Sequence, residues 1–309
     1  MRIGKLSESV LKRSVLKEIQ YKKNDIPMGA GISLDCGIMR VPQGHCAAVT
    51  TDPITCVQTD MAVFAVNAVV NDLVVTGADP VGIFVTALLP PDYMESQLKL
   101  LMRDLNAIAG RMGIQIMGGH TETTTAVNRP VLSMTAVGTA AEDCIYDLRR
   151  AKPGLDIVMT KGIGIEATAI LAREQKAALE QRFTPAFLRQ CAGFIERLSI
   201  VPECQIARTM AVAAMHDVSE GGVFGALWEI GACAGVGIEV DLKKIPVWQE
   251  TIELCEQFDL NPYSVIGGGA ALFLTSDGEG LTAAFNAADI RAEIIGRTTA
   301  GADRVIIND

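Results

Sequence analysis

Three polar side chains interrupt an otherwise apolar helical stretch, "NAVVNDLVVTGADP", at positions 67–80. Asn67 and Asn71 are four residues apart and therefore share one face of a helix. Asp72 follows near the helix C-terminus, where the negative end of the helix dipole disfavours a carboxylate. A cation held nearby would explain Asp72, whereas a solvated polar stripe would explain all three residues. This helix alone leaves both interpretations open.

Three further carboxylates stand at predicted element ends in the same half of the chain. Asp52 ends a strand and precedes Pro53, which holds it in an extended conformation. Asp35 lies in the glycine-bounded stretch "GAGISLDCG", and Glu122 follows the apolar strand "IQIM". In proteins Mg²⁺ is usually bound by one or two carboxylates together with phosphate oxygens and water. These three carboxylates and Asp72 therefore predict a magnesium–nucleotide site with four candidate metal ligands.

The segment "MGGHTETTT", which contains Glu122, supplies three more candidates. Gly118 and Gly119 permit either a close approach of the backbone to a ligand or an unusual turn. His120 is one of only 3 histidines, and it is a candidate acid–base group or phosphate contact. A structural role for a lone histidine in a loop is the alternative.

In the second half of the chain, "MHDVSEGGVFGALWEIG" (215–231) combines a carboxylate with a predicted helix start. Ser219 is expected to cap the helix, and Gly221 and Gly222 fall in its first turn. A glycine there costs roughly 1 kcal/mol relative to alanine. Close approach of an anion to the helix N-terminus would justify that cost, and tight helix–sheet packing is the alternative. Asp217 is a candidate metal or hydroxyl contact. Like His120, it is also a candidate catalytic residue.

A glycine motif after the next predicted strand is a weaker signal. "GIGIEA" (162–167) matches the G-x-G-x-x-A fingerprint of dinucleotide-binding sites. The region about 20 residues further on, "LEQRF", continues a polar helix and contains no strand with an acidic end. A Rossmann site is therefore not expected.

The elements that must position these residues fall into two groups. The first half predicts the order β-α-β-α-β-β, with strands at 46–51, 82–89, 114–117 and 131–140 and helices at 60–76 and 92–112. The second half predicts strands at 156–161, 237–242, 270–276 and 292–298, and helices at 164–181, 185–199, 203–214, 220–234 and 247–258. The polar stretch "DLRRAKPG" separates them. We therefore predict an α/β domain over 1–145 and an α+β domain over 146–309.

Composition narrows the classes of function. The 309 residues are 49% hydrophobic and carry a net charge of −9 without a basic run, which argues against nucleic acid or an anionic membrane as a partner. No apolar stretch reaches the roughly 18 residues of a membrane-spanning helix, and the N-terminus lacks a signal-peptide pattern. The 8 cysteines form no C-x-x-C pair, so buried, reduced thiols are expected rather than a zinc or iron–sulfur site. A cytoplasmic protein is predicted.

Five motifs occur in an order and at separations that resemble the aminoimidazole-ribonucleotide (AIR) synthase superfamily: "VTTDPIT", "NAVVNDLVVTGADP", "GGHTE", "KPGLDIVMTKGIG" and "HDVSEGG". Members of this superfamily include AIR synthase, thiamine-monophosphate kinase, selenophosphate synthetase and the hydrogenase maturation factor HypE. The resemblance covers nearly the whole chain. The opening "RIGKL" and the stretch "TTDPIT" are most similar to the HypE-like branch.

The resemblance implies a PurM-like fold, in which an N-terminal α/β domain pairs in a homodimer to form a shared barrel and an α+β domain follows. It implies binding of ATP with Mg²⁺ and activation of an amide-like or carboxylate oxygen by phosphorylation. A small-molecule kinase of the thiamine-monophosphate type and a non-catalytic nucleotide-binding maturation factor are the alternatives. Carried over by motif, the metal and phosphate contacts are Asp52, Asn71, Asp72 and Glu122, and Asp35 matches the aspartate of the family's first acidic motif. Lys5 and His120 are looser matches, and Asp217 and Gly221–Gly222 match on the second domain.

Two departures from the family pattern stand out. Ser33 and Leu34 precede Asp35, where the family's first acidic motif is richer in carboxylates. HypE ends in a tail whose terminal cysteine carries the carbamoyl group, whereas this chain ends "GADRVIIND" and its last cysteine is Cys255. Nitrile formation on the chain's own tail is therefore not expected, and the sequence does not indicate the acceptor.

Overall fold

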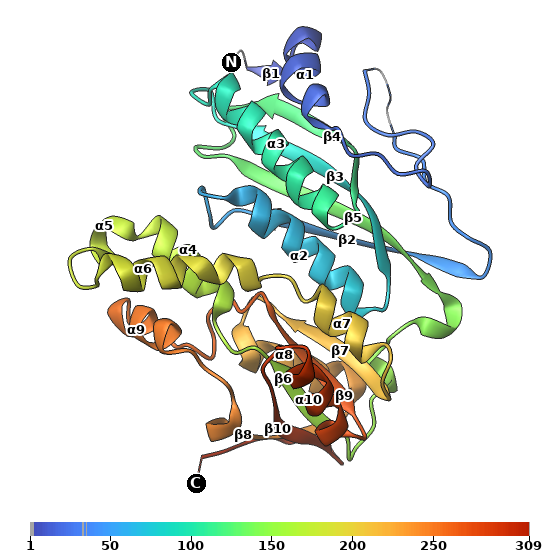
Figure 1. The fold of residues 1–309 in the computed structure, drawn as a ribbon, viewed down its shortest axis with the longest axis vertical. Helices are drawn as coiled ribbons and strands as arrows, with labels where there is room; N and C mark the ends of the chain where they lie inside the picture. The colour runs from blue at the N-terminus through green and yellow to red at the C-terminus, as the bar shows by residue number, and fades with distance from the viewer. Residues whose placement is uncertain (1–2, 33, 35, 309) are drawn as a thin grey trace. The chain divides into compact units, whose positions relative to one another are not determined.

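The structure is a computed structural model that describes residues 3–32, 34 and 36–308. The chain divides into two compact units. Unit 1 runs through Leu73 and takes in Ala78–Cys144, and unit 2 comprises Val74–Gly77 and the chain from Ile145 onward. Each unit is built around its own sheet (Figure 1).

Unit 1 contains a five-stranded sheet with the order β1-β4-β3-β5-β2. Its strands are antiparallel except for the parallel pair β3–β4. The strands are β1 (Gly4–Lys5), β2 (His45–Ile54), β3 (Asp79–Leu89), β4 (Gln115–Thr123) and β5 (Val131–Ala141). The helices are α1 (Glu8–Ser14), α2 (Met61–Val75) and α3 (Glu95–Arg111), with 3₁₀ turns η1 (Leu16–Glu18) and η2 (Glu142–Cys144).

Helices α2 and α3 lie across one face of this sheet (Figure 1). Because successive side chains of a strand point to opposite faces, burial alternates along β3 and β5. Ile83 and Val85 of β3 are buried, whereas Phe84 between them is only partly buried. On the edge strand β2, Val49 is 64% exposed. The second face of the sheet is therefore apolar in part: Val49 is accessible in the single chain, whereas Phe84 packs against a buried cluster that includes Ile26.

Unit 2 contains a six-stranded sheet with the order β11-β8-β10-β6-β9-β7. Its strands are β6 (Asp156–Thr160), β7 (Val212–Val218), β8 (Gly237–Asp241), β9 (Ala270–Thr275), β10 (Ala292–Thr299) and β11 (Arg304–Ile307). The α-helices are α4 (Ile165–Glu174), α5 (Lys176–Leu179), α6 (Pro185–Gly193), α7 (Val201–Ala207), α8 (Gly222–Ala234), α9 (Gln249–Gln257) and α10 (Gly278–Ala287). The 3₁₀ turns are η3 (Leu148–Arg150), η4 (Phe194–Arg197) and η5 (Leu242–Lys244).

The core of unit 2 is centred on β9, which is buried along its whole length. Phe273 of β9 packs against Phe285 of α10, with ring centroids 5.0 Å apart. A strand buried on both faces reads as a continuous apolar run, which is the pattern of "AALFLT". The two-domain mixed α/β fold with two sheets agrees with the expected fold class, while the dimer barrel stays a prediction.

Two local predictions were wrong. The "GGHTE" segment is not a loop, because β4 extends through Thr123 and pairs with both β3 and β1. The helix expected over 203–214 ends at Ala207, and Val212–Val218 form strand β7 instead. The alanines in "VAAMHDV" favour a helix locally, but pairing with β9 supplies the hydrogen bonds that decide the outcome.

The eight cysteines are free thiols. Cys191, Cys204 and Cys255 are buried, as expected, whereas the prediction of burial was wrong for the exposed Cys36, Cys46, Cys56, Cys144 and Cys233. Over the residues that the structure describes, none of the helices combines the length and the apolar character needed to cross a membrane.

Candidate functional site

In unit 1, a hydrogen bond joins the C-terminal part of α2 to strand β2. Thr50 Oγ1 donates to Asp72 Oδ2 at 2.7 Å. Asp52 lies two residues beyond Thr50 and therefore on the same face of the strand. That face is the one covered by helices, since the β5 partners of Thr50 and Asp52, Ala136 and Met134, are fully buried. The fold thus brings the Asp52 and Asp72 carboxylates to one region.

The two amides of α2 are not a solvated stripe. Asn67 is 5% exposed and Asn71 is 3% exposed. Asn67 Nδ2 donates to the Val63 carbonyl at 2.8 Å, within the same helix. Asn67 Oδ1 is buried and accepts no hydrogen bond from the part of the chain that the structure describes. A buried acceptor left without a donor costs about 1–3 kcal/mol, so the burial of these amides calls for a reason other than solubility.

The donor set of this region suits a hard cation. Asp52 and Asp72 offer carboxylate oxygens. Asn67 Oδ1, five residues before Asp72 on the same helix, is a further oxygen that is buried without a partner among the described residues. No group of three or more His, Cys, Asp or Glu side chains arranged to hold a metal is found within the described ranges. Mg²⁺ does not require one, because it usually takes one or two carboxylates and completes its shell with phosphate oxygens and water.

Glu122 and His120 lie elsewhere in unit 1. Both are on β4, which is separated from β2 by β3 and β5. Their β3 partners, Leu88 and Thr86, lie on the face opposite to the helices. His120 Nε2 and Glu122 Oε2 are 3.0 Å apart, so the two side chains contact each other. Within one chain, the structure does not bring Glu122 to Asp52 and Asp72.

Two further candidates of unit 1, Asp35 and Lys5, are wholly or partly outside the residues that the structure describes. Asp35 lies outside the residues that the structure describes, and so does the side chain of Lys5. The backbone of Lys5 pairs with that of Glu122 in the β1–β4 ladder. The metal role of Asp35 and the phosphate role of Lys5 remain predictions.

Gly119 and Gly118 are accounted for by packing within the sheet. A Cβ on Gly119, whose φ is +146°, would lie 2.0 Å from the Val85 carbonyl oxygen of β3. A Cβ on Gly118 would lie 2.9 Å from the ring of Phe84. The chain needs glycine at these positions without any ligand, so a contact to a cofactor there stays a prediction.

In unit 2, Asp217 lies at the end of β7 and is coupled to a histidine. His216 Nδ1 is 3.4 Å from Asp217 Oδ1, and His216 Nε2 is 3.1 Å from Glu229 Oε2 on α8. Burial lowers the pKa of His216, but hydrogen bonding to Asp217 and the charges of Asp217 and Glu229 outweigh it, so the pKa is raised. A protonated His216 would hold Asp217 in place at the strand end.

Gly221 is the N-cap residue of α8 and Gly222 is its first residue, both in left-handed conformation with φ +82° and +62°. The expected cap by Ser219 is wrong, because the glycine at the N-cap has no side chain to cap this helix. A Cβ on Gly222 would lie 2.5 Å from the Tyr263 carbonyl oxygen and 2.7 Å from that of Val265. Packing against this loop is therefore sufficient to require Gly222. Nothing but Gly225 lies within 4 Å of a Cβ on Gly221, so Gly221 is set by its backbone angle.

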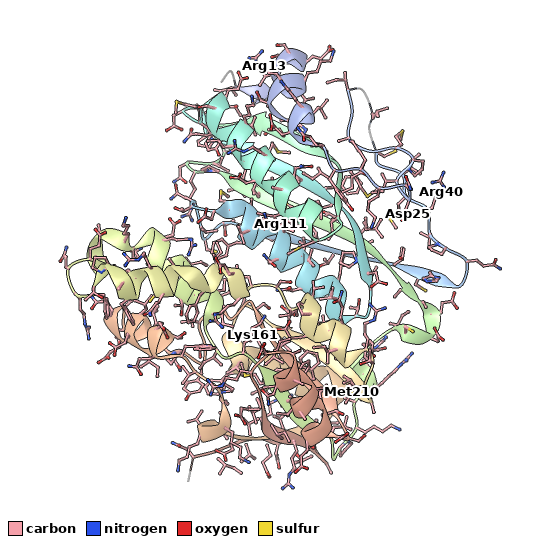
Figure 2. All side chains as sticks on the ribbon, in the orientation of Figure 1. Arg13, Asp25, Arg40, Arg111, Lys161 and Met210 are labelled. Atoms are coloured by element: carbon pink, nitrogen blue, oxygen red, sulfur yellow. The ribbon has the colours of Figure 1, made fainter. Side chains whose placement is uncertain are left out.

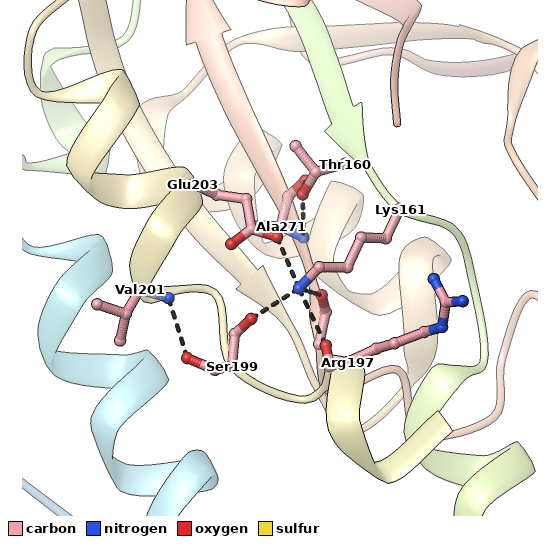
Figure 3. Close-up of polar contacts among 8 residues, drawn as sticks. Thr160, Lys161, Arg197, Ser199, Val201, Glu203 and Ala271 are labelled. Carbon is pink, nitrogen blue, oxygen red and sulfur yellow. Dashed lines mark hydrogen bonds and ion pairs between the residues drawn. The ribbon is translucent and has the colours of Figure 1, made fainter. Parts of the chain in front are cut away.

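Sequence reasoning missed a buried ion pair at the end of β6. Lys161 Nζ is 2.6 Å from Glu203 Oε1, and Glu203 is fully buried. The ammonium also donates to the carbonyls of Arg197 (2.9 Å), Ser199 (2.6 Å) and Gly269 (3.1 Å) (Figure 3). Burial lowers the pKa of Lys161, and Glu203 opposes that shift. The only signal in the sequence was a lysine at the end of an apolar strand, directly before the "GIGIEA" motif.

Lys161 also has an unusual backbone conformation, with φ +59° in a residue that is not glycine. Such a conformation persists only where surrounding contacts over-determine it. Here one side chain ties the connection between η4 and α7, the loop before β9, and Glu203 of α7 to the end of the sheet, which explains how the strain is maintained.

The two-sheet mixed α/β fold, with buried amides and a tethered carboxylate on α2 beside β2, defines a protein of the AIR synthase class. Residues 33–140 match the N-terminal domain of AIR synthase related proteins, and residues 152–308 match their C-terminal domain. The chain belongs to the AIR synthase related protein family.

Several known proteins are similar to this chain. A putative hydrogenase expression/formation protein of Methanocaldococcus jannaschii is 24% identical over 277 residues, covering 86% of this chain and 78% of that protein. The crystal structure of the hydrogenase maturation protein HypE in complex with ATP aligns with a TM-score of 0.79 and 18% identity, covering 96% of this chain and 87% of HypE. The thiamine-monophosphate kinase of Stenotrophomonas maltophilia K279a aligns with a TM-score of 0.79 and 22% identity, covering 100% and 99% of the two chains.

Proposed function

We propose that this protein is an ATP- and Mg²⁺-dependent enzyme that activates an amide-like or carboxylate oxygen by phosphorylation. The observation that carries the proposal is the Asp72 carboxylate, which is bonded to Thr50 at 2.7 Å beside Asp52. The buried Asn67 Oδ1, unpaired among the described residues, lies on the same helix. Family membership supports the same interpretation, and one structural relative is HypE in complex with ATP.

Under this proposal, Asp52 and Asp72 hold Mg²⁺ together with phosphate oxygens of ATP. The bound ion supplies positive charge that neutralises the phosphates. Asn67 and Asn71 orient the phosphates through their amides, which are rigid because both side chains are buried. In unit 2, Asp217 is the candidate contact for the acceptor, and His216 Nδ1 lies 3.4 Å from its carboxylate.

Two alternatives from other classes have specific support. The similarity to thiamine-monophosphate kinase, over 100% of this chain, favours transfer of phosphate to a stable acceptor. The first acidic motif, in which Ser33 and Leu34 rather than carboxylates precede Asp35, favours a nucleotide-binding maturation factor without turnover. The relative described as a hydrogenase expression/formation protein fits such a role, or an enzymatic role in hydrogenase maturation.

Phosphorus NMR of the purified protein with Mg-ATP and a panel of small amides, carboxylates and thiamine monophosphate separates these proposals. Free phosphate released together with a dehydrated or cyclised product supports activation, and a stable phosphoester supports the kinase. Bound ATP without turnover supports the maturation factor. Failure of ATP to bind in the presence of Mg²⁺ overturns all three.

We also propose that the chain forms a homodimer through the face of the unit 1 sheet that α2 and α3 do not cover. This face carries Val49, which is 64% exposed, with partly buried Phe84 and Val137 on neighbouring strands. It also carries His120 and Glu122, so pairing would place these side chains near the partner subunit. Light scattering should give about twice the chain mass of 32.9 kDa. Val49→Glu should yield monomers because it would bury a charge at the interface. A monomeric wild type would contradict the proposal.

A further inference from the structure

Two arginine side chains of unit 2 lie over one indole ring. The guanidinium carbon of Arg197 is 4.6 Å from the centroid of Trp248, and that of Arg291 is 5.8 Å from the same centroid. Arg197 also lies 5.5 Å from the ring of Phe194, which meets Trp248 edge-on at 5.9 Å. Both guanidinium groups are thus held by aromatic faces, which attract cations but occupy none of their hydrogen-bond donors.

Neither guanidinium has a carboxylate partner among the described residues. Other arginines do: Arg13 (labelled in Figure 2) pairs with Glu95, Arg149 with Asp147, and Arg297 with Glu239. In a chain with net charge −9, two arginines at one indole ring without a carboxylate partner among the described residues stand against the general excess of negative charge. Their donors are available to a ligand.

The backbone beneath these arginines is fixed by the Lys161 network. Lys161 Nζ donates to the Arg197 carbonyl at 2.9 Å, and the Lys161 backbone N–H donates to the Arg291 carbonyl at 2.7 Å. The indole is fixed by Gly162, since a Cβ there would lie 2.9 Å from Trp248 Nε1. The backbones of both arginines are therefore held by Lys161 and their guanidinium groups by the Trp248 ring, which lowers the entropy cost of binding a ligand there.

We propose that Arg197 and Arg291 form a binding site for a phosphate group, carried by inorganic phosphate or by a small phosphate monoester. A single guanidinium fork is enough for the two oxygens of a carboxylate. Two guanidinium groups, each with five N–H donors, match a phosphate monoester better than they match a carboxylate, because the phosphate has more acceptor oxygens and a charge of about −1.5 to −2 at neutral pH. This inference does not depend on the proposed function. Its extension, that the site holds the phosphate of a phosphorylated acceptor, does rest on it.

Trp248 makes the site directly observable, because the chain has only 2 tryptophans. In a Trp228→Phe background, which leaves Trp248 as the only tryptophan, inorganic phosphate or glycerol phosphate is titrated at constant ionic strength. Trp248 emission should change saturably. Arg197→Gln and Arg291→Gln should each raise the dissociation constant about tenfold or more, since each removes one charged fork. The substitutions themselves alter the surroundings of Trp248 and hence its emission. Calorimetric titration of the same variants measures binding without relying on that emission.

The matched control is Arg304→Gln, because Arg304 lies 5.4 Å from the centroid of Trp228 as a single cation–π contact in the same unit. It should leave the phosphate titration unchanged, and thermal melts should show that all variants are folded. An equal, unsaturable response to phosphate, sulfate and chloride would show only charge screening and overturn the proposal, as would saturable binding that survives loss of both arginines. Binding of ATP without binding of either phosphate probe would also overturn it. None of these titrations needs Mg-ATP turnover, so a failure here leaves the proposed function standing.

Discussion

Thr50 on β2 donates a 2.7 Å hydrogen bond to Asp72 near the C-terminus of α2. The bond fixes one carboxylate oxygen at the end of a helix where the dipole opposes negative charge. Without a cation, Asp72 should therefore be mildly unfavourable, by roughly 0.3–1 kcal/mol.

The first prediction concerns Asp72→Asn. The apo variant should be as stable as the wild type or slightly more stable, because the amide can still accept from Thr50. Loss of an anionic ligand should weaken Mg-ATP binding about tenfold or more, equivalent to about 1.4 kcal/mol. Thermal melts with and without Mg-ATP measure this, because a ligand of the folded state raises the melting temperature. EDTA should abolish much of the gain of the wild type. Equal gains by both proteins would show that Asp72 is not a metal ligand.

The second prediction concerns the buried pair Lys161–Glu203, whose charged atoms are 2.6 Å apart. Lys161→Met should destabilise the protein by about 3–5 kcal/mol, because it leaves a buried carboxylate without a counter-charge. Glu203→Gln should cost less, since the ammonium keeps its three backbone carbonyls. Urea unfolding of the two single variants and the double variant gives the coupling energy.

Lys176→Met is the control for this pair. Lys176 and Glu180 form an exposed ion pair four residues apart, with side chains 71% and 53% exposed. Exposed pairs of this kind contribute about 0.3–0.5 kcal/mol, so the variant should unfold almost like the wild type. A comparable loss in Lys161→Met and Lys176→Met would mean that the Lys161 network does not stabilise unit 2.

The third prediction is a dependence on pH at the contact between α1 and α3. Glu95 accepts hydrogen bonds from Nε and Nη2 of Arg13 and from Oγ of Ser14, which lowers its pKa from 4.5 to about 2. A carboxyl group with a lowered pKa in the folded state stabilises it fully above the unfolded pKa, and that stability is lost as the pH falls through the folded pKa. The melting temperatures of wild type and Glu95→Gln should therefore differ at pH 7 and converge between pH 4.5 and about 2. A difference that stays constant over this range would refute the assignment.

The fourth prediction separates packing from ligand binding at two neighbouring glycines. Gly119→Ala should destabilise unit 1 by on the order of 3 kcal/mol, because its Cβ meets strand backbone that cannot move aside. That Cβ would lie 2.0 Å from the Val85 oxygen, whereas the Cβ of Gly118→Ala would meet the movable ring of Phe84 at 2.9 Å. Gly118→Ala should therefore cost less. Chemical denaturation without ligand measures the stability of both variants. Equal, small losses of stability would mean that packing does not require these glycines and would favour a role in ligand contact.

Much of the fold could be predicted from the periodicity of apolar residues and from the glycines and prolines that end helices and strands. The apolar run of α2, closed by Gly77, and the amphipathic pattern of α3 appear within about three residues of their predicted bounds. The family was recognisable because its motifs are short, local and ordered along the chain. These features depend on residues close in sequence, which is why the sequence alone determined them.

Other features depend on which strands pair. "GGHTE" has the glycines and polar residues of a loop, yet β1 and β3 flank it and make it strand. "VAAMHDV" has the alanines of a helix, yet it pairs with β9. In both segments the hydrogen bonds come from strands distant in the sequence, so local propensity gave the wrong element.

The candidate site divides in the same way. The sequence identified Asn67, Asn71 and Asp72 because polar residues stand out in an apolar helix. Only the tertiary structure placed Thr50 against Asp72, set Glu122 on the opposite face of the sheet, and enclosed Lys161 with Glu203. The sequence alone determines the type and spacing of each residue. Burial and partners depend on contacts between segments distant in the sequence, and those contacts decide which carboxylates can act together.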